Sequence, residues 1–344
     1  MTAKRPDGLS PRRGHILRII VGDYVENAAP VGSEHVARNH SLGVSPATIR
    51  NDMAALEEDG YIAQPHTSAG RIPSDKGYRY FVEMLMEQVE FPAEVQKQVR
   101  TGLHSEGDLE DWTRVGSAML AQLTQTMSLI TTARAANAKV KHLELVLVQD
   151  TVTLMILVLQ EGRVRQQLLH LDTTMTQDEL SALSRRVSLN AGGMQAPQIQ
   201  ALADGATGVE GQVLRAAAKV MDAEDAPRPD DVHFGGFKSL VQEPEFGSNQ
   251  RLRTLMEVVD DREFLLGLLG RLSSPTDTKA VIGQENPEES LHDFSIVVAS
   301  YGKPGELSGT IAVMGPTRMR YGNAFAAVRY VSQSMTELMN QRFG

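Results

Sequence analysis

Hydrophobic positions in the first 60 residues recur at intervals of three and four, which predicts three helices. The first helix begins at Ser10-Pro11 and has one apolar face, made of Ile16, Leu17, Ile20, Val21 and Tyr24. Residues 31–38 predict a short second helix, and residues 39–43 supply a turn with a glycine near its end. In a third helix, Ile49, Met53 and Leu56 follow one another at i, i+4 and i+7 and form a buried stripe.

The third helix has recognisable start and stop signals. Ser45 is suited to cap its free N–H groups, Pro46 fits the first helical position, and Gly60 is placed to end it in a left-handed conformation. The outward side of its N-terminal half carries Ala47, Arg50, Asn51 and Ala54. Small residues permit close approach to DNA, while Arg pairs with guanine and Asn with adenine in the major groove. Taken alone, the same pattern also fits an ordinary solvated surface helix.

The segment that follows the third helix decides between these interpretations. Residues 61–64, a loop from Pro65 to Gly70, and Arg71-Ile72 predict a short hairpin with a basic tip. Three helices followed by such a hairpin are the parts of a winged helix-turn-helix, which predicts sequence-specific DNA binding. For base contacts we predict Ser45, Ala47, Thr48, Arg50 and Asn51. For contacts of the wing and the DNA backbone we predict His66, Ser68, Arg71, Lys76 and Arg79.

The rest of the chain mixes helical and strand periods. An apolar ridge from Leu109 to Ile130 predicts one long helix, and residues 142–171 predict an antiparallel meander with two-residue connections. Thr176 to Glu179 has the capping-box pattern that opens a helix. The later elements are a strand near 232–241, helices near 249–258 and 262–271, strands at 294–300 and 307–314, and a final helix at 321–339.

The strands predict a mixed α+β body. The early meander and the late strands are each too small to bury a core, so we expect distant strands to join one sheet, with a helical insertion between them. A chain of 344 residues predicts two or three domains.

Composition limits the chemistry of the protein. There is no cysteine, which excludes thiolate nucleophiles, disulfides and Cys-ligated zinc and fits a reducing cytoplasm. No apolar run approaches membrane-spanning length, so a soluble, cytoplasmic protein is expected. The net charge of −9 belongs to the body: residues 1–80 hold ten Lys and Arg against nine Asp and Glu, whereas the remainder holds 24 against 34. The acidic body is interpreted chiefly as a means of solubility.

Enzymatic patterns are weak. The glycines of 235–239 lack the spacing of a phosphate-binding loop, and the nine histidines are scattered without the i, i+4 pair of zinc proteases. We therefore expect no enzyme, and no catalytic, cofactor-binding or metal-binding residues.

Several motifs together resemble one known family. They are Ser45 to Leu56, Gln64 to Pro73, Asp75 to Arg79, Ile282 to Asn286 and Gly315 to Tyr321. In order and spacing they are similar to the heat-inducible transcription repressor HrcA family over nearly the whole chain. The resemblance implies a bacterial heat-shock repressor that binds as a homodimer to double-stranded DNA at an inverted-repeat operator, called CIRCE, upstream of chaperonin and chaperone genes. It also implies the GroEL chaperonin as a partner. For 283–286 and 315–321 we expect structural roles.

The resemblance also implies the domain organisation. It comprises a winged helix-turn-helix domain at 1–90, a discontinuous GAF-like α+β domain at 91–172 and 278–344, and an inserted dimerising α+β domain at 173–277. Two alternatives stay open: a small-molecule-responsive regulator whose GAF-like domain binds a ligand, and a scaffold that has kept the winged helix for protein contacts. Salt dependence separates the scaffold from a DNA-binding protein, because DNA binding weakens steeply with ionic strength.

Overall fold

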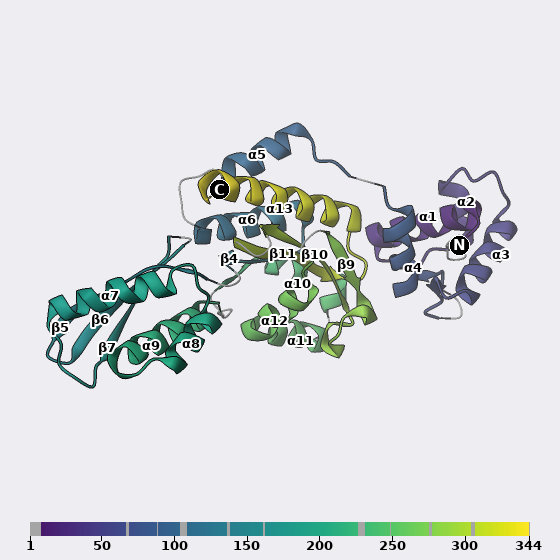
Figure 1. Cartoon of the computed structure of the whole chain (residues 1–344). Coiled ribbons are helices and arrows are strands. Elements are labelled where there is room, and N and C mark those ends of the chain that lie inside the picture. The colour runs from purple at the N-terminus through teal and green to yellow at the C-terminus, as the bar shows by residue number, and fades with distance from the viewer. Residues whose placement is uncertain are drawn as a thin grey trace, which may run out of the picture. The chain divides into compact units, whose positions relative to one another are not determined.

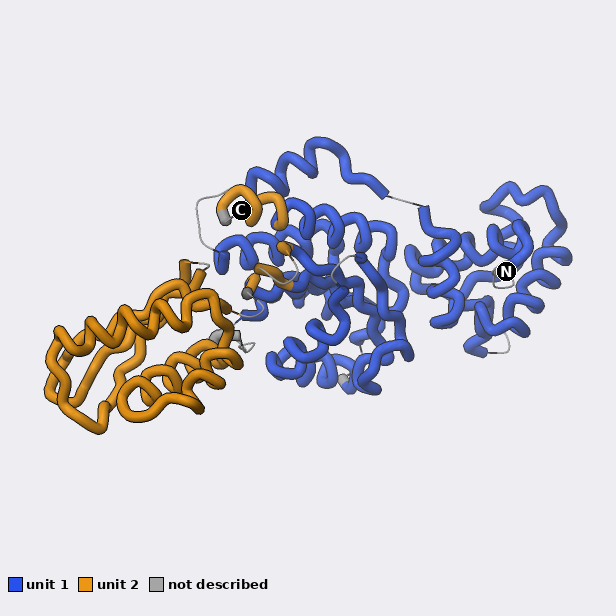
Figure 2. Tube along the Cα trace, viewed as in Figure 1, with its two compact units in different colours: residues 1–132, 230–301, 310–335 blue, residues 133–229, 302–309, 336–344 orange. Residues whose placement is uncertain are grey.

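The computed structural model describes residues 8–66, 69–87, 89–103, 109–135, 138–160, 162–225, 231–247, 249–274, 277–303 and 307–343. Its contacts divide the chain into two compact units (Figure 2). The first unit contains residues 1–132, 230–301 and 310–335, and the second contains residues 133–229, 302–309 and 336–344. Each unit has its own hydrophobic core, and each is described by itself below.

The N-terminal part of the first unit, residues 8–85, is called the head. Its elements are α1 (Pro11–Asn27), α2 (Ser33–Asn39), α3 (Pro46–Glu58), β1 (Ile62–Ala63), β2 (Ile72–Pro73), α4 (Asp75–Tyr80) and a π-helix (Phe81–Leu85) (Figure 1). Strands β1 and β2 pair antiparallel, and Val31 forms a bridge with Arg71 beside them. The predicted order of three helices and a hairpin is confirmed, and the head is a winged helix.

Helix α3 begins and ends where its sequence signals predict. The Ser45 hydroxyl accepts the Thr48 N–H at 3.2 Å, which satisfies one of the free donors of the first turn. Gly60 has φ +78°, and beyond it the Tyr61 N–H returns to the Leu56 carbonyl at 2.9 Å. This 6→1 bond is the mark of a Schellman motif, which stops the helix before the wing.

The remainder of the first unit, called the body, is built on a six-stranded sheet in the order β8-β3-β11-β10-β9, with β4 on β11, and the pairs β8–β3, β3–β11, β4–β11 and β10–β9 are antiparallel. The strands are β3 (Met127–Thr131), β4 (Arg134–Ala135), β8 (Val232–Gly235), β9 (Lys279–Ile282), β10 (Phe294–Gly302) and β11 (Leu307–Pro316). Its helices are α5 (Ala93–Leu103), α6 (Leu109–Thr124), α10 (Phe237–Val241), α11 (Asn249–Asp260), α12 (Arg262–Leu272) and α13 (Tyr321–Phe343), with short 3-10 turns at Pro244–Gly247, Gly283–Glu285 and Glu289–Leu291.

Helices cover both faces of this sheet. Figure 1 shows α6 and α13 on one side and α11 and α12 on the other. Leu265 and Leu269 of α12 share a buried cluster with Phe294 and Ile296 of β10. The sheet is therefore buried on both sides, which explains why β10 and β11 carry nearly continuous apolar residues.

The second unit contains a separate antiparallel sheet in the order β5-β6-β7. Its strands are β5 (Val140–Gln149), β6 (Val152–Leu159) and β7 (Val164–His170), followed by α7 (Gln177–Ala191), α8 (Ala196–Gly205) and α9 (Gly208–Asp225). Leu143, Leu145, Met155 and Leu157 point from one face of the sheet into a core with these helices. The predicted capping box at Thr176 and Glu179 opens α7.

Three expectations from the sequence are wrong. The meander does not join the late strands, because its own helices cover it and complete a core. The ridge from Leu109 is not one helix: α6 ends at Thr124, Gln125 adopts φ +54°, and Met127 starts strand β3. The segment 232–241 is not one strand, because Gly236 adopts φ +73° and α10 follows it.

The borders of the compact units differ from those of the predicted domains, which stay a prediction. The meander lies in the second unit, whereas residues 230–277 belong to the first unit, although the expected insertion was 173–277. The chain leaves the six-stranded sheet after β3 and returns to it at β8, its antiparallel neighbour. At this point the Thr132 N–H donates to the Asp231 carbonyl at 2.8 Å. The inserted segment thus starts and ends at adjacent positions of the body.

Candidate nucleic-acid interface

Helix α3 divides into a buried side and an exposed side. Ile49, Met53 and Leu56 are buried in the head, as the spacing predicted. Arg50 and Asn51 are exposed, together with Ala47 and Ala54 on the same side. Both long polar side chains are thus accessible near the N-terminal end of the helix, between two small residues. This arrangement suits insertion of the helix into a groove of DNA.

The first turn of α3 presents hydroxyl groups. Besides accepting the Thr48 N–H, the Ser45 hydroxyl lies 3.0 Å from the Thr48 hydroxyl. Ser45 is exposed and Thr48 is half-buried, so both remain near the surface. The positive end of the helix dipole lies here, where it favours an approaching phosphate. The observed role of Ser45 is capping, and its predicted DNA contact stays a prediction.

An acid that sequence reasoning did not single out fixes the orientation of α3. Asp52 is only 5% exposed and its carboxylate accepts two hydrogen bonds from Arg12 of α1, at 2.6 and 3.1 Å. Arg13 adds a second positive charge at 3.6 Å. The hydrogen bond from Arg12 lowers the pKa of Asp52, although burial opposes the shift. The signal was present in the sequence, because Asp52 lies three residues after Ile49 on the apolar side.

The base of the wing is tied to the end of α3. The Arg71 guanidinium pairs with the Glu57 carboxylate at 2.8 Å, and the Arg71 main chain exchanges two hydrogen bonds with Val31. At Gly70 a Cβ would lie 2.5 Å from the Val31 backbone, so only glycine permits this approach. His66 is exposed in the loop, whereas Ser68 lies outside the described residues. Arg71 therefore positions the wing. A DNA phosphate that contacts Arg71 would share its guanidinium with the Glu57 carboxylate.

Lys76 lies at the same end of the helix. Its ammonium donates to the Asp59 carbonyl at 2.7 Å and sits 4.5 Å from the centre of the Tyr61 ring. The charge therefore stabilises the C-terminal end of α3. Lys76 is exposed and its phosphate contact stays a prediction.

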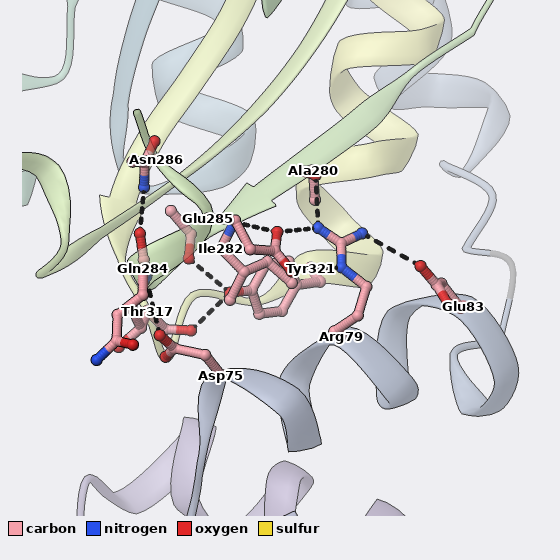
Figure 3. Close-up of polar contacts among 12 residues, drawn as sticks. Asp75, Arg79, Glu83, Ala280, Ile282, Gln284, Glu285, Asn286, Thr317 and Tyr321 are labelled. Atoms are coloured by element: carbon pink, nitrogen blue, oxygen red, sulfur yellow. Dashed lines mark hydrogen bonds and ion pairs between the residues drawn. The ribbon is translucent and has the colours of Figure 1, made fainter. Parts of the chain in front are cut away.

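Arg79 makes its observed contacts with residues of the body. Its guanidinium binds the Glu285 carboxylate through two nitrogens and donates to the Ala280 carbonyl at 2.8 Å (Figure 3). A further ion pair with Glu83 spans 3.6 Å. Arg79 thus takes part in the contact between head and body, and its predicted contact with the DNA backbone stays a prediction.

The exposed side of α3 borders a hollow of about 460 Å³ in the head. Glu34 of α2, Arg50 and Met53 of α3, and Gln64 and Arg71 of the wing line it. Its walls thus come from the parts of a winged helix that surround a nucleic acid. Within the described residues, no group of three or more His, Asp or Glu is arranged to hold a metal ion, and no described helix is long and apolar enough to cross a membrane.

A winged helix with an accessible arginine and asparagine on its third helix, joined to a mixed α+β body, defines the class of winged-helix transcription regulators. Within this class the chain belongs to the HrcA family. Residues 110–325 match the family model described as the HrcA protein C-terminal domain.

Relatives match over nearly their whole length. The heat-inducible transcription repressor HrcA of Roseiflexus castenholzii is 37% identical over 345 residues, which cover 98% of this chain and 96% of the relative. The HrcA of Dehalococcoides mccartyi strain 195 is 37% identical over 342 residues, covering 98% and 97%. A crystal structure described as a hypothetical protein superposes with a TM-score of 0.59 at 23% identity, covering 97% of this chain and 99% of that one, and shows a shared fold.

Proposed function

We propose that the protein is a heat-shock repressor that binds, as a homodimer, an inverted-repeat operator of the CIRCE type upstream of chaperonin and chaperone genes and blocks their transcription until heat stress. The observation that carries the proposal is the exposed pair Arg50 and Asn51 on α3 of a winged helix in an HrcA-family chain. Its role is one of binding rather than catalysis. Repression follows from steric occlusion of polymerase at the promoter.

In this proposal α3 enters the major groove with its N-terminal end first. Arg50 then reaches the guanine O6 and N7 atoms, and Asn51 reaches the adenine N6 and N7 atoms. The acids Glu57, Glu58 and Asp59 stay at the far end of the helix, away from the phosphates. The wing follows the groove beside it.

The second unit supplies a surface suited to a dimer. On the sheet face opposite its helices, Val146 pairs in register with Leu154, and Leu154 with Leu168, which makes an apolar row across three strands. Val148 is 57% exposed and Leu168 is 56% exposed. Such a face is costly to leave in water, and a second copy of the chain offers an identical face to cover it. We therefore propose the dimer contact in 133–229.

Charge on this face tests the dimer. Leu168→Lys is expected to convert the protein to monomers in light scattering. Leu189→Lys is the matched control, because Leu189 is 85% exposed on α7, which covers the other face of the sheet. Dimers that persist in Leu168→Lys, or that dissociate equally in both variants, contradict this location of the interface.

Variants of α3 test the DNA contact. Arg50→Ala and Asn51→Ala should each lose roughly 1–3 kcal/mol for the operator, about 5- to 150-fold in Kd, and discriminate less between operator and scrambled duplex. Arg38→Ala is the control, since Arg38 is an exposed arginine of α2 paired with Glu34. If both α3 variants keep the parent's affinity and its preference for the operator, direct base contacts by α3 are excluded.

Two further measurements address the alternatives. Steep loss of affinity with salt supports DNA binding over a scaffold role, because phosphate contacts release counterions. The family favours a heat-shock repressor over a ligand-responsive regulator. For the heat response we propose reversible local unfolding of the body, with the GroEL chaperonin restoring the folded repressor. Full operator affinity of the purified protein well above growth temperature contradicts this.

A further inference from the structure

Three sequence motifs without a role in DNA contact meet at one place in the first unit. They are residues 75–79 of α4, residues 283–286 after β9, and residues 317–321 before α13, and Figure 3 shows them together. The first motif belongs to the head and the other two belong to the body. We call this set of contacts the latch.

The first contact of the latch joins a carboxylate of the head to the backbone of the body. Asp75, at the start of α4, accepts a hydrogen bond from the Gln284 N–H at 2.9 Å. Gly283 before it has φ +52°, and a Cβ there would lie 2.2–2.5 Å from the carboxyl atoms of Asp75. The glycine is thus required twice, by its left-handed backbone and by the closeness of the carboxylate.

The second contact is a fixed ion pair. The Arg79 Nε–H donates to Glu285 Oε1 at 2.8 Å, and another nitrogen of Arg79 binds Oε2. Glu285 is itself held, because Oε2 also accepts the Ile282 N–H at 2.9 Å. A bidentate arginine–carboxylate pair fixes direction as well as distance, so α4 is held in one orientation.

An aromatic contact lies beside the ion pair. The rings of Tyr78 and Tyr321 have centroids 5.7 Å apart, and Tyr78 is only 2% exposed. The Tyr321 hydroxyl lies 2.7 Å from the Thr317 carbonyl and 2.8 Å from the Ser295 hydroxyl. The body thus holds the Tyr321 ring in place, and Tyr78 of the head packs against it.

A further contact between head and body lies at the C-terminal end of α1. Arg318 donates to the Val25 carbonyl at 3.0 Å, and Val25 lies in the last turn of α1, where carbonyls lack helical partners. Arg318 is 10% exposed on its side chain and is paired with Glu243 and Glu245 of the body. A cation thus caps the negative end of α1 from the body side.

The latch therefore contacts two separate helices of the head, α1 and α4. A single contact point would leave the head free to rotate, whereas contacts at the end of α1 and along α4 oppose rotation. Helix α4 follows the wing strand β2 after one residue, Ser74. Buried and half-buried charge pairs of this kind contribute more to a unique orientation of the head than to net stability. Any other orientation would leave one of the two charges buried without its partner.

We propose that the latch determines which half-site spacing the repressor accepts. The inference rests on the proposed function, in which two heads of a dimer bind an inverted repeat. Heads on free tethers adapt to many separations, since the second binding event then depends only on tether length. Heads fixed to their bodies lose this freedom, so the dimer accepts fewer separations and rotational phases of the two half-sites.

The test compares operator duplexes of natural spacing with duplexes whose spacer is one or two base pairs longer. Each added base pair moves the half-sites apart by about 3.4 Å and turns them by about 35°. The parent is expected to lose tenfold or more in affinity at two added base pairs. Arg79→Met and Glu285→Gln should lose less than threefold, while their affinity for a single half-site stays at the parent's value.

Controls separate the possible failures. Arg38→Met removes an exposed ion pair with Glu34 that lies within α2 of the head, and it should keep the parent's spacing preference. Glu285→Gln changes the body side alone and leaves the head sequence intact, so agreement with Arg79→Met excludes misfolding of α4 as the cause. A parent that binds no inverted repeat overturns the proposed function. If both latch variants keep the parent's spacing preference, only the proposal on the latch is overturned. The same holds if both variants bind the operator of natural spacing more tightly than the parent does.

Discussion

The close approach of Asp75 to Gly283 makes a sharp prediction for Gly283→Ala. Alanine at φ +52° costs about 1–2 kcal/mol for the left-handed backbone. Its Cβ would also displace the Asp75 carboxylate, and a hydrogen bond that involves a charged group contributes about 1.5–3 kcal/mol. We therefore expect Gly283→Ala to lower the free energy of unfolding of the first unit by about 3 kcal/mol.

The two contributions separate in a double-mutant cycle. In the Asp75→Ala background there is no carboxylate to displace, so Gly283→Ala should cost only the backbone contribution, about 1–2 kcal/mol. The assay is urea unfolding of the full chain followed by the fluorescence of Trp112, the only tryptophan of the sequence, which is buried on α6 of the body. An equal cost of Gly283→Ala in both backgrounds would show that the carboxylate does not lie against this glycine.

Two further predictions concern the head. Gly60→Ala should weaken the protection of α3 amides against hydrogen exchange by about 1–2 kcal/mol, because Gly60 has φ +78°. The control is Gly22→Ala, because Gly22 lies in the interior of α1 with open space around it. This control should be neutral or stabilise the helix by up to about 1 kcal/mol. Similar effects of both substitutions would contradict the left-handed cap. Because Arg12 lowers the pKa of folded Asp52, this ion pair stabilises the head above the unfolded pKa of about 4 and loses its effect as pH falls through the folded value. Asp52→Asn should therefore be less stable at pH 7 and show a weaker acid dependence below pH 4 in thermal melts; an unchanged acid dependence argues against the pair.

The head was predictable because its signals are local. The cap at Ser45, the stripe from Ile49 to Leu56 and the glycine at position 60 all act within one helix, and each is found where the sequence placed it. The exposure of Arg50 and Asn51 follows from the same periodicity. Their contacts with bases remain a prediction, since those depend on a partner.

The sequence was least informative where distant residues decide the structure. Arg79 looks like a free basic residue near the wing, but its partner Glu285 lies 206 residues away. Met127 and Ile130 continue the spacing of three and four residues of α6, yet they pair with β11 and become a strand. The meander carries apolar residues on both faces, so its sequence did not show which face the following helices cover. Pairing over such distances leaves no local pattern.

The hydrogen bond between Thr132 and Asp231 has an evolutionary meaning. A module whose first and last residues lie next to each other can be gained, lost or exchanged by a single genetic event. The path of the chain through the rest of the fold then stays the same. The helices and three-stranded sheet of 133–229 therefore form a module that can be exchanged without a change in the strand order of the six-stranded sheet. Relatives with another module between the positions of Thr132 and Asp231 would be free to oligomerise in another way and still keep the same DNA-facing surface.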